Sequence, residues 1–187
     1  TGVQTCALPI FMNYTRLEHS LIDLIKEEQA KLGYRKEIIH LYYPLSSLNH
    51  FFKSQADADK MQEMLCDFPS YIYNIFGEVT VSHKKDRFCF TLSEKASEYV
   101  HDRMEENEFI KALVNLVAKH GCTMDEIKNL FSSYSDQIYT EPMNNDEFDL
   151  LIRFEDGSDP YYYCFKDEGC HIIYHRFLPE DYADFEF

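Results

Sequence analysis

The feature of this sequence that most constrains its fold is a change in hydrophobic period near residue 135. Before that point, apolar residues recur mainly every three or four positions, as in amphipathic helices. After it, the stretches FDLLIRF, YYYCF and CHIIYHRF have the length and composition of strands. A chain that groups its helices and its strands in separate stretches is typical of the α+β class. We therefore predict an α+β fold.

The strand segments predict antiparallel pairing. DGSDP and KDEG separate the three C-terminal runs and are rich in turn residues, so we expect a three-stranded antiparallel meander there. Earlier in the chain, GEVTVSHKKDRFCFTLS alternates apolar and polar residues on either side of HKKD, which indicates a β-hairpin. The short run EIIHLYYP, which Pro44 closes, indicates one more strand. The simplest arrangement joins all these strands in one sheet covered by helices.

Helical spacing predicts an N-terminal helical layer and a two-helix corner in the middle of the chain. The stretch LEHSLIDLIKEEQAKLGY has a buried stripe between Leu17 and Ile25, and DADKMQEMLCDF, YIYNIF and EKASEYVHDRM also have helical spacing. NEFIKALVNLVAKHG is strongly amphipathic and ends at Gly121. Thr123 and Glu126 then form a capping box, which predicts that a second helix starts there.

The first ten residues, TGVQTCALPI, are expected to lie outside the folded protein. They contain no Lys or Arg, and a secretory signal needs a basic region at its start. Instead they resemble the in-frame translation of a common sequencing-library adapter. We therefore treat residues 1–11 as a non-native segment, and we expect residues 12–187 to form a single α+β domain.

The chain is acidic, and its negative charge is concentrated towards the C-terminal end. The net charge is −15, and residues 136–187 contain 14 Asp and Glu but only three Arg and Lys. Such a surface repels nucleic-acid phosphates and anionic lipids, so we expect neither nucleic acid nor a membrane as a partner. Asp125 and Glu126 at the start of the second corner helix also argue against a DNA-reading helix. The charge favours a basic protein partner, although solubility alone also accounts for it.

The number of cysteines indicates in which cellular compartment the protein is expected. Without Cys6, five cysteines remain, and an odd number without a secretory signal favours reduced thiols in the cytoplasm. No apolar run approaches the roughly 20 residues that a transmembrane helix needs. We therefore expect a cytoplasmic protein.

The run YYYCF is apolar on both faces of its expected strand. Such a strand either lies at the centre of a covered sheet or contacts a partner, because a tyrosine ring can be buried while its hydroxyl stays in water. We predict a non-enzymatic interaction or regulatory module that uses this acidic, Tyr-rich C-terminal sheet. The partner-binding candidates are Asp156, Asp159, Tyr161, Tyr163, Asp167 and Glu168.

An alternative hypothesis is a metal-binding or thiol-dependent enzyme centred on Cys164, Cys170, His171 and His175. On a strand, His171 and His175 share a face and Cys170 points to the other, so the four converge only if a bulge intervenes. The same alternation makes His171 a poor base for the Cys170 thiol. No nucleotide-binding or hydrolase motif occurs, and we predict no catalytic residue and no cofactor.

Three long stretches resemble a known family. They are MNYTRLEHSLIDLIKEEQAKLGYRKEIIHLYYPLSSLNHFF, NEFIKALVNLVAKHGCTMDEI and FKDEGCHIIYHRFLPEDYADF. Together they resemble an uncharacterised bacterial family that is known only as a domain of unknown function. The resemblance implies a bacterial, single-domain, intracellular protein. It implies no activity, no substrate and no functional residue.

Overall fold

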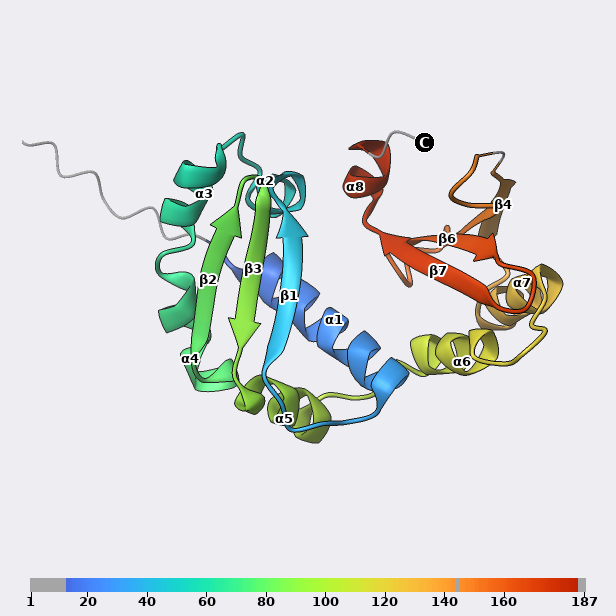
Figure 1. The fold of residues 1–187 in the computed structure, drawn as a ribbon, viewed down its shortest axis with the longest axis horizontal. Helices are drawn as coiled ribbons and strands as arrows, with labels where there is room; N and C mark the ends of the chain where they lie inside the picture. Colours follow the sequence, from blue (N-terminus) through green and yellow to red (C-terminus); the bar gives the residue numbers. More distant parts are fainter. Residues whose placement is uncertain (1–12, 144, 185–187) are drawn as a thin grey trace, which may run out of the picture.

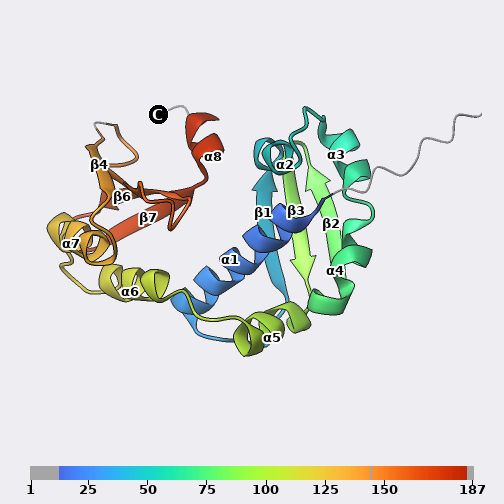
Figure 2. The same ribbon diagram turned by 180° about the vertical axis from the view of Figure 1, so that it is seen from behind.

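The computed structural model describes residues 13–143 and 145–184, which form two lobes side by side (Figures 1 and 2). The expected non-native segment, residues 1–11, lies outside the described residues. Helices and antiparallel sheets are both present, which confirms the α+β class. The strands do not join one sheet, as the simplest arrangement supposed. They form a three-stranded sheet in the N-terminal lobe and a four-stranded sheet in the C-terminal lobe.

The N-terminal lobe is a three-stranded sheet with helices packed on one face. Its strands have the order β1-β3-β2, so the predicted hairpin of β2 and β3 gains β1 as a third, antiparallel strand. The elements are α1 (Thr15–Leu32), β1 (Ile39–Pro44), α2 (Leu45–Phe52), α3 (Ala58–Met64), α4 (Phe68–Phe76), β2 (Val79–Lys84), β3 (Arg87–Leu92) and α5 (Glu94–Arg103).

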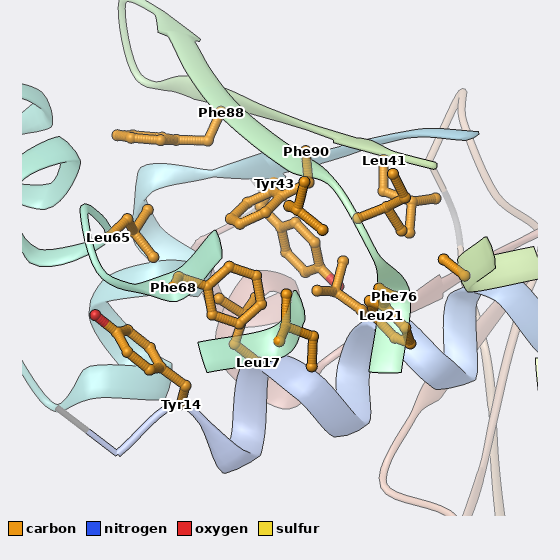
Figure 3. Packing of buried hydrophobic residues seen from close by; sticks show 14 of the residues in the cluster. Tyr14, Leu17, Leu21, Leu41, Tyr43, Leu65, Phe68, Phe76, Phe88 and Phe90 are labelled. Atoms are coloured by element: carbon orange, nitrogen blue, oxygen red, sulfur yellow. The ribbon is translucent and has the colours of Figure 1, made fainter. Parts of the chain in front are cut away.

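The core of this lobe lies between α1, α4 and the inner face of the sheet (Figure 3). The predicted stripe of α1 supplies Leu17 and Leu21, which are fully buried. Phe68 of α4 and Phe90 of β3 meet edge to face, with their ring centroids 5.8 Å apart. The opposite face of the sheet carries mainly polar and half-exposed side chains, as antiparallel sheets with one solvated face do.

Gly77 ends α4 in a conformation that only glycine adopts easily. Its φ is +71°, and an added Cβ would lie 2.8 Å from the Ser93 hydroxyl, which itself donates to the Phe76 carbonyl at 2.5 Å. We expect Gly77→Ala to lower the free energy of unfolding by about 2–3 kcal/mol, because it adds backbone strain and displaces this hydroxyl.

Gly157→Ala is the matched control for this substitution. Gly157 also has a positive φ of +75°, but nothing lies within 4 Å of its added Cβ. It should therefore show only the backbone cost of about 1 kcal/mol. Equal losses for the two variants in urea denaturation would show that the close approach at Ser93 contributes nothing.

The C-terminal lobe packs two helices against a four-stranded antiparallel meander. The three predicted strands are confirmed as β5, β6 and β7, and β4 is added at the edge. The sequence pattern did not indicate β4, because it is short and four of its five residues are exposed. The elements are α6 (Glu108–Val117), α7 (Met124–Tyr134), β4 (Ile138–Pro142), β5 (Leu150–Phe154), β6 (Tyr162–Asp167), β7 (Ile172–Phe177) and α8 (Pro179–Asp184).

The predicted two-helix corner is α6 and α7, and it covers one face of this sheet. The capping box of Thr123 and Glu126 begins α7 as expected. Phe109 of α6 and Phe131 of α7 meet edge to face at 4.8 Å, and both pack against Tyr163 of β6. A smaller cluster on the other face includes Cys164 and half-buried side chains near α8.

Helix α1 serves both lobes. It crosses in front of the sheet of the N-terminal lobe in the view of Figure 2, and its C-terminal end reaches α6. Ala30 near that end packs against the core of the C-terminal lobe, and Leu178 packs against both cores. Within the part of the chain that the structure describes, no helix combines the length and hydrophobicity that crossing a bilayer requires.

Candidate functional site

A surface groove follows β1 at the side of the N-terminal lobe that faces the C-terminal lobe. It consists of two adjoining hollows of about 490 Å³ and 450 Å³, which share Leu24 and Tyr42. The first hollow lies between β1 and the C-terminal half of α1, and residues 37–42 line it continuously. The second extends from the end of β1 to residues of β7 and α8. We call the two hollows together the β1 groove.

The backbone of β1 is open towards this groove. Strand β1 is an edge strand, hydrogen-bonded to β3 alone among the described strands. An edge strand presents N–H and C=O groups that can pair with another chain. Exposed apolar side chains accompany this edge, because Leu32, Ile38 and Tyr42 are each more than half exposed. The groove therefore offers both unpaired backbone groups and apolar surface.

The charges that line the groove are mainly negative. Glu28 and Glu37 are exposed in the first hollow, and Asp181 lines the second. Among the described lining residues, the sole Lys or Arg is Arg176, whose side chain is only 3 % exposed. A ligand in the groove therefore meets carboxylates and the exposed imidazole of His40, but no accessible Lys or Arg.

Arg176 fixes the C-terminal lobe to α1. Its guanidinium forms ion pairs with Asp23, at 3.2 Å, and with Glu27, to which its Nε also donates at 2.7 Å. The same guanidinium lies over the ring of Tyr161 at 4.2 Å. Lys31 adds a further ion pair to Glu27 at 2.8 Å. These side chains join β7, the entry to β6 and α1 in one buried cluster at one end of the groove.

The pKa of Glu27 is lowered in this cluster. Burial by itself would raise it, but the Arg176 charge and the hydrogen bonds from Lys31 and Arg176 outweigh that effect. Tyr174 also donates its hydroxyl to Glu27, at 3.0 Å. Glu27 is therefore a buried carboxylate that stays ionised and accepts from three residues.

A second carboxylate of the cluster has the opposite shift. Burial raises the pKa of Asp159, although it accepts hydrogen bonds from the Tyr161 backbone N–H and the Tyr163 hydroxyl, both at 2.8 Å. Burial also raises the pKa of both tyrosine hydroxyls. The two hydrogen bonds to Asp159 therefore hold the start of β6 in place.

The partner-binding residues expected from the sequence do not form one surface. Tyr163 is fully buried and Tyr161 is 9 % exposed, so neither ring forms the exposed face that the sequence suggested, although Tyr161 lines the second hollow. Asp159 belongs to the same buried cluster. Asp156, Asp167 and Glu168 are exposed, but Asp156 lies in the β5–β6 loop, Asp167 is the last residue of β6, and Glu168 follows it in the β6–β7 turn.

Two of these exposed acids, Asp156 and Asp167, accept local hydrogen bonds that stabilise the neighbouring turns. Asp156 accepts from the hydroxyls of Ser135 and Ser158, and these bonds lower its pKa to about 2. Asp167 accepts from the Gly169 backbone N–H at 2.7 Å and so shapes its turn.

The cysteine and histidine candidates form two pairs, Cys164 with His175 and Cys170 with His171. Cys164 is buried against Phe148 and Leu151, and burial raises its pKa to about 12. His175 lies opposite Cys164 in the strand register, beside the Phe177 ring. No group of three or more His, Cys, Asp or Glu within the described residues is arranged to hold a metal ion.

Cys170 and His171 correct one expectation. They precede β7, which begins at Ile172, so the alternation of a strand does not apply to them. The Cys170 Sγ lies 3.1 Å from the His171 Nδ1, and both side chains are exposed. The sequence argument that separated these two groups was therefore wrong.

Comparison with known proteins gives one match. The family model described as "Domain of unknown function, E. rectale Gene description (DUF3877)" matches residues 14–185. The chain belongs to this family. The resemblance to a bacterial domain of unknown function is thereby confirmed, and DUF3877 spans both lobes and the β1 groove. No curated protein and no solved structure matches the chain.

Sequence reasoning placed the site of this DUF3877 chain in the C-terminal sheet and missed the β1 groove. The available signal was EIIHLYYP, a short strand that ends in Pro44, since proline within sheets is largely confined to edge strands and strand ends. Glu37 is the first residue of that run and lies two residues before β1 begins, and Glu28 lies on the preceding helix. The sequence could not show that the open edge of this strand faces a groove.

Proposed function

We propose that this protein is a non-enzymatic interaction module that binds a basic, extended segment of a partner protein in the β1 groove. The observation that carries the proposal is the open edge of β1 beside two hollows whose accessible charges are carboxylates. The bound segment would add an antiparallel or parallel strand to the sheet of the N-terminal lobe.

The backbone supplies the affinity in this mode of binding. Main-chain hydrogen bonds from β1 pair with the added strand, and alternate side chains of that strand point into the hollow or away from it. The apolar side chains of Leu24 and Ile39 line the first hollow, where alternate residues of the segment would be buried. The floor is α1, which is held by the fully buried Leu17, Leu21 and Ile25.

The carboxylates of the β1 groove determine which partner segments bind. Glu28 and Glu37 are exposed and would face lysine or arginine side chains of the bound segment. Exposed charges of this kind contribute mostly to association rate and specificity. An acidic segment would be disfavoured by the same two residues. This proposal keeps the basic partner that the net charge of −15 suggests, but moves its binding surface to the N-terminal lobe.

The test uses a fluorescent eight-residue peptide that alternates lysine and valine, and a counterpart that alternates glutamate and valine. Fluorescence anisotropy should show saturable binding of the lysine peptide only. We expect Glu28→Lys combined with Glu37→Lys to weaken that binding about tenfold or more, since each carboxylate becomes a repelling cation. Amide hydrogen exchange should show protection of residues 38–44 when the lysine peptide is bound.

The matched control reverses the same number of charges elsewhere. Asp136→Lys combined with Glu168→Lys changes the net charge equally, and both residues are exposed in the C-terminal lobe outside the groove. This variant should bind the lysine peptide within about twofold of the unaltered protein. Equal weakening by the two double variants, or protection that spares β1, would exclude the groove as the binding surface.

A further inference from the structure

The turn between β6 and β7 holds a thiol and an imidazole in direct contact. The Cys170 Sγ and the His171 Nδ1 are 3.1 Å apart, and both side chains are exposed to solvent. A thiol beside an imidazole can pass its proton to the ring, which leaves a thiolate, the nucleophilic form of cysteine. The contact therefore distinguishes Cys170 chemically from an isolated surface cysteine.

Backbone hydrogen bonds hold this pair in position. The Cys170 carbonyl accepts from the Gly121 N–H at 3.2 Å, which ties the turn to the α6–α7 corner. The His171 carbonyl accepts from the Glu168 N–H at 3.0 Å, which closes the turn itself. Both members of the pair are thus fixed at the backbone, and their side chains meet without depending on the groove or on the lobe junction.

The other described cysteines lack this combination. Cys122 and Cys164 are buried, and burial raises the pKa of both thiols, which makes them poor nucleophiles. Cys89 is only half exposed. Cys66 is exposed, but it makes no hydrogen bond to an imidazole among the described residues. Cys66 is therefore a built-in control for Cys170.

We propose that Cys170 is a site of reversible S-thiolation by small disulfides, with His171 as the group that accepts its proton. The Cys170 thiolate attacks one sulfur of the small disulfide and forms a new S–S bond. The original S–S bond breaks, and the second half leaves as a thiolate that takes up the proton held on His171. No oxidant beyond the disulfide is needed, and a small thiol reverses the reaction.

The charges around the turn oppose one another. Asp167 at the end of β6 and Glu168 in the turn disfavour a negative charge on the sulfur. Lys119 and His120 on the adjoining α6–α7 corner favour one. These surface charges have both signs, so their effects on the Cys170 thiol oppose one another. The reactivity of this thiol therefore depends mainly on the His171 imidazole, which contacts its sulfur. The proposal is also independent of the β1 groove, to which neither Cys170 nor His171 contributes.

The test measures modification of each cysteine by oxidised glutathione at pH 7, with timed quenching by an alkylating agent and peptide mass spectrometry. We expect Cys170 to react about tenfold faster than Cys66, because the His171 imidazole 3.1 Å from its sulfur can accept the thiol proton. His171→Gln should bring the Cys170 rate to within about twofold of the Cys66 rate, and the Cys66 rate should not change.

The pH profile supplies a second readout. The advantage of Cys170 over Cys66 should shrink as the pH rises to 9, where ordinary thiols also ionise. His171 is exposed, so its replacement should leave the two buried cysteines as unreactive as before, which shows that the fold is intact. Equal rates for Cys170 and Cys66 in the unaltered protein, or an unchanged Cys170 rate in the His171→Gln variant, would overturn the proposal.

Discussion

Replacing Arg176 with methionine should lower the free energy of unfolding by about 3–5 kcal/mol at pH 7, which is the usual cost of removing one partner of a buried ion pair. The substitution keeps most of the aliphatic volume but removes the guanidinium that pairs with both Asp23 and Glu27, so that Glu27 retains only its ion pair with Lys31. Glu27 is only 6 % exposed, so solvent would compensate little of the lost charge. Urea denaturation followed by circular dichroism measures the loss directly.

Arg153→Met is the matched control, because Arg153 has the same kinds of contact in a more exposed place. It pairs with Glu155 at 3.2 Å and lies over the Tyr139 and Tyr162 rings, but its side chain is 32 % exposed. Ion pairs of this exposure contribute about 1 kcal/mol or less. A loss at Arg176 no greater than the loss at Arg153 would mean that the cluster does not stabilise the lobe junction.

The cost of Arg176→Met should also depend on pH, with a definite sign. The pKa of Glu27 is lower in the folded protein than in the unfolded chain. Its contribution to stability is therefore complete above the unfolded pKa and is lost as the pH falls through the folded pKa. The stability difference between the unaltered protein and the variant should accordingly narrow between pH 7 and pH 3.5. A difference that widens on acidification would contradict this assignment.

Phe131→Ala is expected to cost about 3–5 kcal/mol as well, through a cavity in the core of the C-terminal lobe. Phe131 is fully buried, and its ring lies 5.1 Å from that of Phe154 and 5.2 Å from that of Tyr163. The rings of Phe154 and Tyr163 belong to paired strands of the β-sheet, whose ladder hydrogen bonds limit how far they can move into the space. Thermal or urea unfolding of the variant measures the cost.

This variant also tests how the two lobes unfold. We propose that residues 12–187 behave as a single domain, because α1 contributes to both lobes and Arg176 joins them. If so, Phe131→Ala should lower the unfolding midpoint of both lobes together, even though Phe131 lies in the C-terminal core. Amide exchange would report separate midpoints for β1–β3 and for β5–β7 if the lobes instead unfold independently.

Much of the architecture followed from local patterns. The stripe on α1, the hairpin of β2 and β3, and the capping box at Thr123 each depend on neighbours within a few residues, so periodicity predicted them correctly. Two features were beyond local patterns. Strand β4 is short and exposed on most of its length, and the pairing of β1 with β3 joins segments about 50 residues apart.

The site was harder to predict than the fold, because it depends on which segments meet. YYYCF was correctly seen as apolar on both faces, but only the structure shows that Tyr161 and Tyr163 are buried beside Arg176. Glu27 directly precedes Glu28 in the sequence, and nothing there indicates that its ion pair with Arg176 spans 149 residues. The sequence shows that a residue is charged, but it does not show which distant residue will form an ion pair with it.

That long separation has a consequence for synthesis. While the chain emerges from the ribosome, α1 leaves the exit tunnel long before β7 has been translated. During that interval, Asp23 and Glu27 lack the Arg176 guanidinium, Glu27 has only the Lys31 ion pair on its own helix, and the surface that will meet the C-terminal lobe faces water. The nascent N-terminal lobe can complete its own core early, whereas the final docking step must await nearly the whole polypeptide.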